Sequence, residues 1–310
     1  MLEVTDLVIP IGSRDRLKVA GFEVQPESRL GVCGMAEPVD ALRLVLTGAL
    51  TPVSGAVNRG RCGYMPRLEF VAFGETTGDF LRTMAALQGL HRLKAAARIN
   101  RVRDLCGLQG QGLPPSAPFS RRRLYNQKLN LAQALMPDPE VLLVHEPFAG
   151  LDPDGRDQLR HLLVRAASGR SMLLFTNETP GLRDMVDEIM VLSLQGVVAR
   201  DAPADLLADS PWRNYIRVDF PLMTREQKQE IFTALPALRQ RVTERNGSWF
   251  LPGDLRKQEA GILAEYCSAR GIDIRLTEGR GDLDTVIHSL SLDDLPLPPD
   301  APVMNPGVSS

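Results

Sequence analysis

Short apolar segments that alternate with amphipathic ones constrain the fold of this 310-residue chain most strongly. Residues 29–34 form an apolar run that ends in glycine, and residues 39–50 carry apolar side chains at helical spacing. Because the short segment 35–38 lies between them, we expect a strand, a turn and a helix in that order. The alternation returns with the apolar run 141–144. This pattern predicts an α/β domain whose mostly parallel sheet has helices on both faces.

The strand, turn and helix at residues 29–50 are also the context in which a P-loop holds phosphate. Counting from Gly34, the second P-loop glycine is Val39, the lysine is Asp40 and the hydroxyl residue is Ala41. Glu37 and Asp40 therefore bring two negative charges to the place where backbone N–H groups and a lysine would attract phosphate. A unit charge about 4 Å away is worth about 4 kcal/mol at an effective dielectric of about 20. By itself the segment is a weak match, and an ordinary strand, turn and helix explains it better.

A second segment, 141–153, has the sequence Val-Leu-Leu-Val-His-Glu-Pro-Phe-Ala-Gly-Leu-Asp-Pro. It resembles the part of ATP-binding cassette (ABC) ATPases that runs from the Walker B strand, ending in Glu146, into a D-loop containing Leu151 and Asp152. Other likenesses follow in the family's order: Pro-x-Ser-Gly at 52–55, Gly-Tyr-Met-Pro at 63–66, a helix at 127–135, and strands at 173–176 and 196–200. The resemblance covers about residues 1–210. It implies a P-loop NTPase core with a helical subdomain at about 68–137.

Most positions that handle nucleotide in that family carry other residues here. The replaced positions are Ile11 at the adenine-stacking aromatic, Asp40 at the P-loop lysine, Arg67 at the Q-loop glutamine, Arg121–Arg123 after the matching Ser120 at the signature motif, His145 at the Mg²⁺ aspartate and Asn177 at the switch histidine. Glu146, at the general-base position, and the D-loop pair are retained. ATP and Mg²⁺ are thus implied by the resemblance alone, and the sequence indicates no metal site.

Each singled-out residue also has an ordinary structural explanation. Glu146 is either a general base or a carboxylate at the end of a strand, and His145 is either a metal ligand or a partly buried histidine with a local hydrogen bond. The basic run Arg121–Arg123 could bind an anion at a helix N-terminus, face a partner, or lie in solvent. The segment 123–126 could also be a loop insertion, since the spacing to Gln127 is two residues longer than in the family.

Composition and charge limit the class of protein. A hydrophobic content of 44% is typical of globular proteins, and a net charge of −2 gives no reason to expect nucleic acid as a partner. No apolar run reaches the ~18 residues that span a bilayer, and the N-terminus lacks the basic start of a signal peptide. The four cysteines are scattered, which is typical of reduced thiols in a cytoplasmic protein.

Residues 211–292 form a separate unit in this interpretation. Strands are expected at 214–220, 241–244, 249–251 and 272–277, and helices at 224–238 and 255–270, with an Asn-Gly hairpin turn at 246–247. The order β-α-β-β-α-β predicts a small α+β, ferredoxin-like layer. It resembles the C-terminal accessory domain of ABC-2-type exporter ATPases. The Pro- and Asp-rich residues 293–310 are expected to be disordered.

Together these features predict a degenerate ABC subunit of an export-type transporter that pairs with a second, intact ATPase subunit and with membrane permease subunits. It would lie at the inner face of the cell membrane through those partners and not hydrolyse ATP itself. The sequence leaves open whether the chain pairs with itself. Two alternatives remain: an ATPase that works with unusual residues, and a non-enzymatic regulatory or scaffold protein derived from one.

Overall fold

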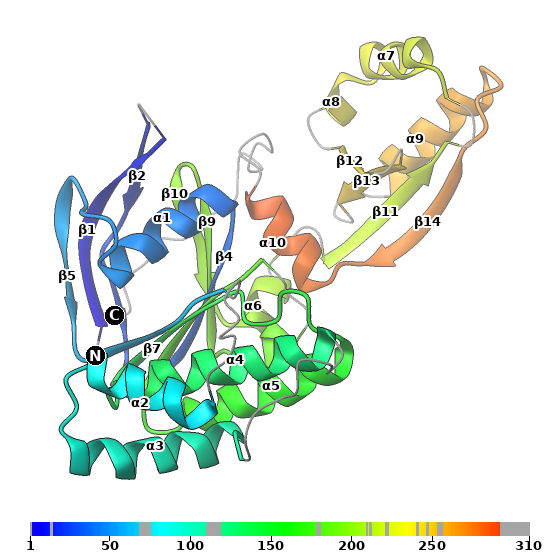
Figure 1. Cartoon of the computed structure of the whole chain (residues 1–310). Coiled ribbons are helices and arrows are strands. Elements are labelled where there is room, and N and C mark those ends of the chain that lie inside the picture. Colours follow the sequence, from blue (N-terminus) through cyan, green and yellow to red (C-terminus); the bar gives the residue numbers. More distant parts are fainter. Residues whose placement is uncertain are drawn as a thin grey trace. The chain divides into compact units, whose positions relative to one another are not determined.

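The structure is a computed structural model of the chain. It describes residues 2–12, 15–67, 76–109, 119–177, 181–208, 210, 213–220, 223–239, 242–245, 248–252 and 257–291. The chain divides into two compact units, unit 1 from Met1 to Val197 and unit 2 from Val198 to Ser310 (Figure 1). Each unit is described by itself.

The main sheet has the strand order β10-β9-β4-β8-β7-β6. Its strands are β4 (Arg29–Gly34), β6 (Cys62–Met65), β7 (Val141–His145), β8 (Ser171–Phe175), β9 (Glu188–Ser193) and β10 (Gly196–Asp201). Strands β9, β4, β8, β7 and β6 pair in parallel, and β7 and β8 are buried apart from the partly exposed His145. Continuous apolar strands of this kind are typical of parallel sheets covered on both faces, as the sequence predicts. The carboxyl ends of the strands meet at one edge of the sheet.

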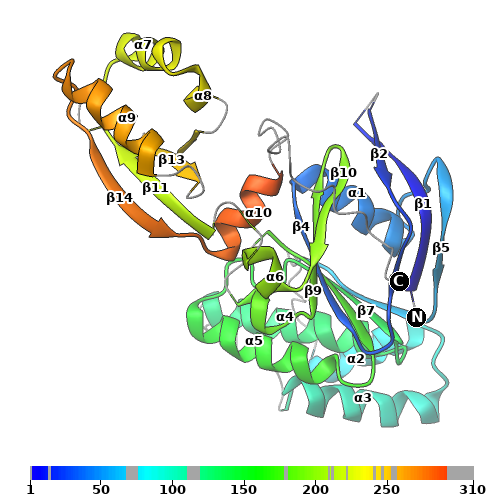
Figure 2. The same ribbon diagram turned by 180° about the vertical axis from the view of Figure 1, so that it is seen from behind.

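A smaller antiparallel sheet packs against the other side of helix α1 (Ala36–Thr47). Its strands are β1 (Leu2–Ile11), β2 (Asp15–Val19), β3 (Phe22–Val24) and β5 (Ser54–Arg59). One core cluster contains side chains of this sheet, of α1 and of the main sheet. Helix α1 thus lies between the two sheets, as both views show (Figures 1 and 2). Its position fixes the side chains that it presents to the edge of the main sheet.

The helical part of unit 1 contains α2 (Thr77–Leu87), α3 (Arg92–Cys106) and α4 (Phe119–Leu135), followed after β7 by α5 (Pro153–Ala166). Helices α2, α3 and α4 lie within residues 68–137, where the family resemblance implies a helical subdomain. The loop insertion considered at 123–126 is wrong, because α4 is continuous through these residues. Residues 119–135 include no glycine or proline, so nothing interrupts the helix. A short 3-10 helix, Leu182–Asp184, precedes β9.

Unit 2 begins within β10, continues with α6 (Pro203–Ala208) and contains the expected order β-α-β-β-α-β. The elements are β11 (Asn214–Asp219), α7 (Arg225–Ala234) with the short α8 (Pro236–Arg239), β12 (Thr243–Arg245), β13 (Ser248–Pro252), α9 (Lys257–Ser268) and β14 (Arg275–Arg280), with α10 (Leu283–Ser291) at the end. The strands form an antiparallel sheet in the order β12-β13-β11-β14. Thr224 and Gln227 form a capping box at the start of α7.

Some expectations for unit 2 need correction or lie outside the described residues. Strand β14 begins at Arg275 and not at residue 272, because Ile272 and Ile274 pack into the core before the strand starts. The Asn-Gly turn at 246–247 and the segment 293–310 lie outside the described residues. Within the described part of the chain, no helix is long and apolar enough to cross a membrane.

Candidate functional site

Helix α1 begins at Ala36, two residues after Gly34, and so includes most of the segment 35–38 that the sequence predicts as a turn. That expectation is wrong, and the physical reason lies in the residues. Glu37 suits a first helical turn because the helix dipole stabilises a carboxylate there, and Pro38 is tolerated because its missing N–H would have no partner in the first turn. A P-loop holds phosphate in an open loop of N–H groups, whereas this segment is helical.

Three further positions aligned with nucleotide contacts have packing roles. Gly34 has φ of 123°, and a Cβ at this residue would lie 2.1 Å from the carbonyl oxygen of Leu192 on β9, so the neighbouring strand already requires a glycine. Val39 and Ala41 are buried in the core cluster around α1. Ile11, at the position of the adenine-stacking aromatic, is 4% exposed and offers no stacking surface.

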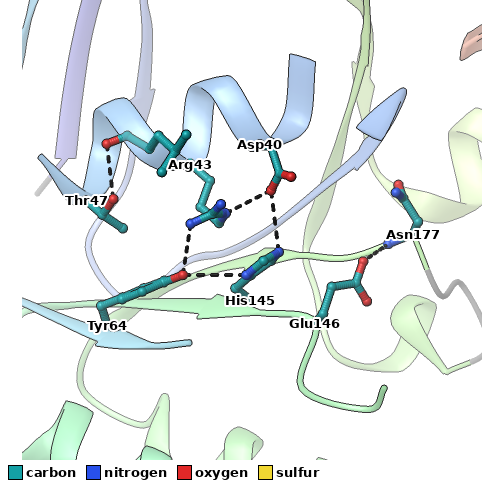
Figure 3. Close-up of polar contacts among 8 residues, drawn as sticks. Asp40, Arg43, Thr47, Tyr64, His145, Glu146 and Asn177 are labelled. Atoms are coloured by element: carbon teal, nitrogen blue, oxygen red, sulfur yellow. Dashed lines mark hydrogen bonds and ion pairs between the residues drawn. The ribbon is translucent and has the colours of Figure 1, made fainter. Parts of the chain in front are cut away.

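Asp40, Arg43, Tyr64 and His145 form a closed polar network, which we call the α1–β7 network (Figure 3). Arg43 Nε donates to Asp40 Oδ1 at 3.0 Å, and its Nη1 donates to the Tyr64 hydroxyl at 3.0 Å. The Tyr64 hydroxyl lies 3.5 Å from His145 Nδ1, and His145 Nε2 lies 3.5 Å from Asp40 Oδ1. The side chains of Arg43 and His145 are 13% and 16% exposed, whereas that of Asp40 is about half exposed. The network therefore joins α1 to the ends of β6 and β7 beneath a solvent-facing carboxylate.

The protonation of His145 follows from this geometry. Burial, followed by the nearby Arg43 guanidinium, lowers the pKa of His145 from 6.5 to about 4, against the opposing effect of Asp40. The imidazole is therefore neutral at neutral pH, and its contact with Asp40 is not an ion pair. With Nε2 protonated toward Asp40, Nδ1 can accept from the Tyr64 hydroxyl, while that oxygen accepts from Arg43. Burial also raises the pKa of the Tyr64 phenol, which keeps it a donor.

Glu146 lies beside this network but is engaged with strand β8. Its Oε2 accepts from the Thr176 hydroxyl at 3.1 Å. Its Oε1 accepts from the backbone N–H of Asn177 at 2.8 Å, as Figure 3 shows. The residue has φ of 42°, a left-handed conformation that non-glycine residues adopt infrequently. Both carboxylate oxygens thus join the end of β7 to the end of β8.

The basic residues expected near the site are separated by their positions in the fold. Arg67 is exposed just after β6. Ser120 lies in the first turn of α4, and Arg121 is exposed there, whereas Nε of Arg122 is buried without a hydrogen-bond partner among the described residues. Arg123 Nη1 donates to the carbonyl of Ala149 at 3.0 Å. The run thus has one member facing solvent and one that contacts the D-loop of its own chain.

The retained D-loop pair has clear structural contacts. Asp152 caps helix α5, because its Oδ1 accepts from the backbone N–H of Gly155 at 2.8 Å, and Pro153 follows at the first helical position. Leu151 is 6% exposed. Arg123 packs so closely on Gly150 that a Cβ there would collide with its guanidinium. The D-loop is therefore held between α4 and α5 of the same chain.

Sequence reasoning missed Arg43 and Tyr64 as members of the site. A signal for Arg43 was available, since residues three apart on a helix are neighbours and an Asp–Arg pair at that spacing interacts. Tyr64 lies in β6 beside β7, where Met65 pairs with Val144, but that register is a property of the folded sheet. The described residues contain no group of three or more His, Cys, Asp or Glu side chains that could hold a metal ion.

Comparisons with known proteins agree with this geometry at the level of fold. No protein-family model matches the chain. It is 24% identical over 202 residues to the uncharacterized ABC transporter ATP-binding protein YxlF of Bacillus subtilis, covering 62% of this chain and 68% of that protein. It is 28% identical over 179 residues to the Nod factor export ATP-binding protein I of Paraburkholderia xenovorans, covering 56% and 57%. It is 27% identical over 114 residues to the energy-coupling factor transporter ATP-binding protein EcfA2 of Staphylococcus saprophyticus, covering 36% and 40%.

These matches leave part of each relative unaligned, since the chain spans between 40% and 68% of their lengths. A solved structure described as the ATP-binding subunit of an ABC transporter superposes with a TM-score of 0.56 at 21% identity, over 67% of this chain and 92% of that one. The chain is therefore a distant homologue of ABC transporter ATP-binding subunits and has the α/β fold of an ABC ATPase.

Proposed function

We propose that this chain is a non-hydrolysing subunit of an export-type ABC transporter. It pairs with a second, intact ATPase subunit and transmits nucleotide-dependent closure of that pair to permease subunits. The observation that carries the proposal is the α1–β7 network, in which the chain's own side chains occupy the position that the family uses for phosphate and Mg²⁺. Such a subunit is a pseudo-ATPase within an active assembly.

The residues present do not suit Mg-ATP. Phosphate near Asp40 would meet a carboxylate in place of a lysine, a repulsion of about 4 kcal/mol at about 4 Å and a dielectric of about 20. His145 is neutral and hydrogen-bonded where the family has an anionic Mg²⁺ ligand. Phosphoryl transfer depends mainly on positioning of the phosphate and neutralisation of its charge. Asp40 and the neutral His145 supply neither.

The rest of the proposal concerns assembly. The relatives named as ATP-binding proteins of transporters, including a Nod factor exporter, support a transport role at the inner face of the membrane through permease subunits. We place the ABC-like domain at residues 1–210, with its helical subdomain at about 68–137. The βαββαβ part at 211–292 serves as a ferredoxin-like accessory domain, which its sheet order β12-β13-β11-β14 supports.

Isothermal titration of the full chain with Mg-ATP tests the pseudo-ATPase proposal. We expect no binding tighter than ~100 μM, which corresponds to about −5.5 kcal/mol. Tighter binding would contradict it. Affinity isolation of the chain from its host cells, with no tag on the proposed partners, tests the assembly. A permease and an intact ABC ATPase should co-purify with it. Their absence would favour a regulatory or scaffold protein that no longer serves a transporter.

The alternative of an active ATPase rests on the retained Glu146. That carboxylate already accepts two hydrogen bonds from the end of β8, which reduces its freedom to act as a base. Steady-state ATP hydrolysis distinguishes the two functions. Turnover by the purified chain that disappears in Glu146→Gln would establish the active enzyme, and we expect no turnover in either protein.

A further inference from the structure

The sheet of unit 2 has two faces of different chemistry. On one face, Val218, Trp249 and Leu251 form a core with residues of α7 and α9. Because side chains alternate between the two faces of a strand, the residues beside them point to the opposite face. Tyr215 on β11 and Phe250 on β13 are such residues, and neither belongs to the core cluster.

Tyr215 and Phe250 lie side by side across the two central strands. Their ring centroids are 5.5 Å apart with planes inclined at 59°, and both side chains are partly exposed. Tyr215 is also opposite Gly279 on β14, where a Cβ would lie 2.3 Å from its ring. The tyrosine ring therefore rests over a glycine, which marks a close approach to the strand. Its outward face is left for another planar group.

Positive charge flanks this aromatic pair. The Arg217 guanidinium lies 6.0 Å from the centroid of Phe250, and its side chain is 49% exposed although Nε donates to Asp219 at 2.8 Å. Arg275 pairs with Asp219 in the strand register and is exposed. Both arginines thus lie near the Asp219 carboxylate on this face, and Arg217 is hydrogen-bonded to it. Among the described residues, the Tyr215 hydroxyl has no hydrogen-bond partner, so it is free to contact a ligand.

We propose that this face of unit 2 binds a nucleoside monophosphate. The base stacks on the ring of Tyr215 with the inclined ring of Phe250 against its edge, since every nucleobase has a π-face and such stacking tolerates differences between bases. The phosphate pairs with Arg217 and Arg275, whose planar guanidinium groups match phosphate oxygens. The two arginines match the charge of one phosphate, and a longer strand is the alternative that the experiment distinguishes.

Titration of the full chain with uridine monophosphate, followed by protein NMR or calorimetry, tests this site. We expect saturable binding that weakens about tenfold or more in Tyr215→Leu and in Phe250→Leu, which keep apolar bulk but remove the ring. Arg217→Gln should weaken binding of the monophosphate while leaving that of uridine unchanged. The matched control is Tyr266→Leu on α9, where Arg270 lies 3.8 Å over the tyrosine ring but off this face. That variant should bind as the wild type does.

Three results would overturn the proposal. The first is no saturation by the wild-type chain at millimolar nucleotide. The second is unchanged affinity in Tyr215→Leu, Phe250→Leu and Arg217→Gln proteins that keep the far-ultraviolet circular dichroism of the wild type. The third is much tighter binding of a short oligouridylate than of the monophosphate, which would make the ligand a single strand. The Mg-ATP titration is also repeated with the Tyr215→Leu protein. If this variant still binds Mg-ATP tightly, ATP does not bind at the unit 2 face, and the pseudo-ATPase proposal fails independently of the present one.

Discussion

The interior of strand β7 and its carboxyl end contrast sharply. Residues Val141 to Val144 are at most 1% exposed and pair in register with β6 and β8. The next two residues, His145 and Glu146, are partly exposed, and their polar atoms contact other side chains and backbone of the same chain. The interior satisfies a requirement of the fold, which any protein with this sheet has. The end is not constrained by that packing, so its side chains can differ while the sheet persists.

The two glycine positions of the P-loop pattern make the same distinction. Gly34 is kept where a Cβ would lie only 2.1 Å from the backbone of β9, whereas the second glycine is Val39, buried in the core. The chain thus has a glycine where the backbone of the neighbouring strand leaves no room for a side chain, and an apolar residue where the core has room for one.

The largest expected effect is in the strand interior. Leu143→Ala removes a side chain that is 1% exposed between the two layers, and should lower the free energy of unfolding by about 2–5 kcal/mol. Urea denaturation followed by circular dichroism measures it. Hydrogen exchange of peptides from β7 and β8 shows whether the loss is local to unit 1. A decrease in the free energy of unfolding of less than about 1 kcal/mol would mean that packing does not constrain the interior of β7 more strongly than its carboxyl end.

Sequence patterning predicts the interior far better than the edge. Apolar runs and helical spacing place β4, β7 and α1, because burial of apolar side chains determines these elements, and the family resemblance indicates β8. The start of α1 is not predicted correctly, since a P-loop pattern suggests a turn while the residues 35–38 accept a helical first turn. The α1–β7 network joins residues 81 positions apart in the chain, so only the folded register brings Tyr64 to His145.

A smaller effect is expected at the edge and depends on pH. Because the folded-state pKa of His145 is lowered to about 4, the unfolded chain binds more protons between pH 6.5 and 4. The contribution to stability is complete above pH 6.5 and is lost as the pH falls toward 4. It amounts to at most roughly 3 kcal/mol, at about 1.4 kcal/mol for each unit by which the two pKa values differ.

Urea denaturation at several pH values between 7.5 and 4.5 (roughly the range in which a histidine titrates) measures this contribution as the difference between wild type and His145→Gln. Carboxylates that also titrate cancel in that difference. The matched control is His161→Gln, at an exposed histidine on α5, which should leave the acid dependence as in the wild type. An unchanged pH dependence in His145→Gln would show that the imidazole is not held neutral by the network.

The smallest effect concerns the D-loop, where a residue retained from the family also has a structural role. Asp152→Ala removes the cap of α5 and should cost about 1 kcal/mol of stability, whereas Asp152→Ser keeps an acceptor for the Gly155 N–H and should cost little. Denaturation of the two variants measures the cap. If Asp152→Ser folds normally but no longer associates with the ATPase subunit that we propose as its partner, the carboxylate serves that interface as well. If both variants associate as the wild type does, Asp152 serves only to cap α5. It is then a residue that the fold requires, as the fold requires the interior of β7.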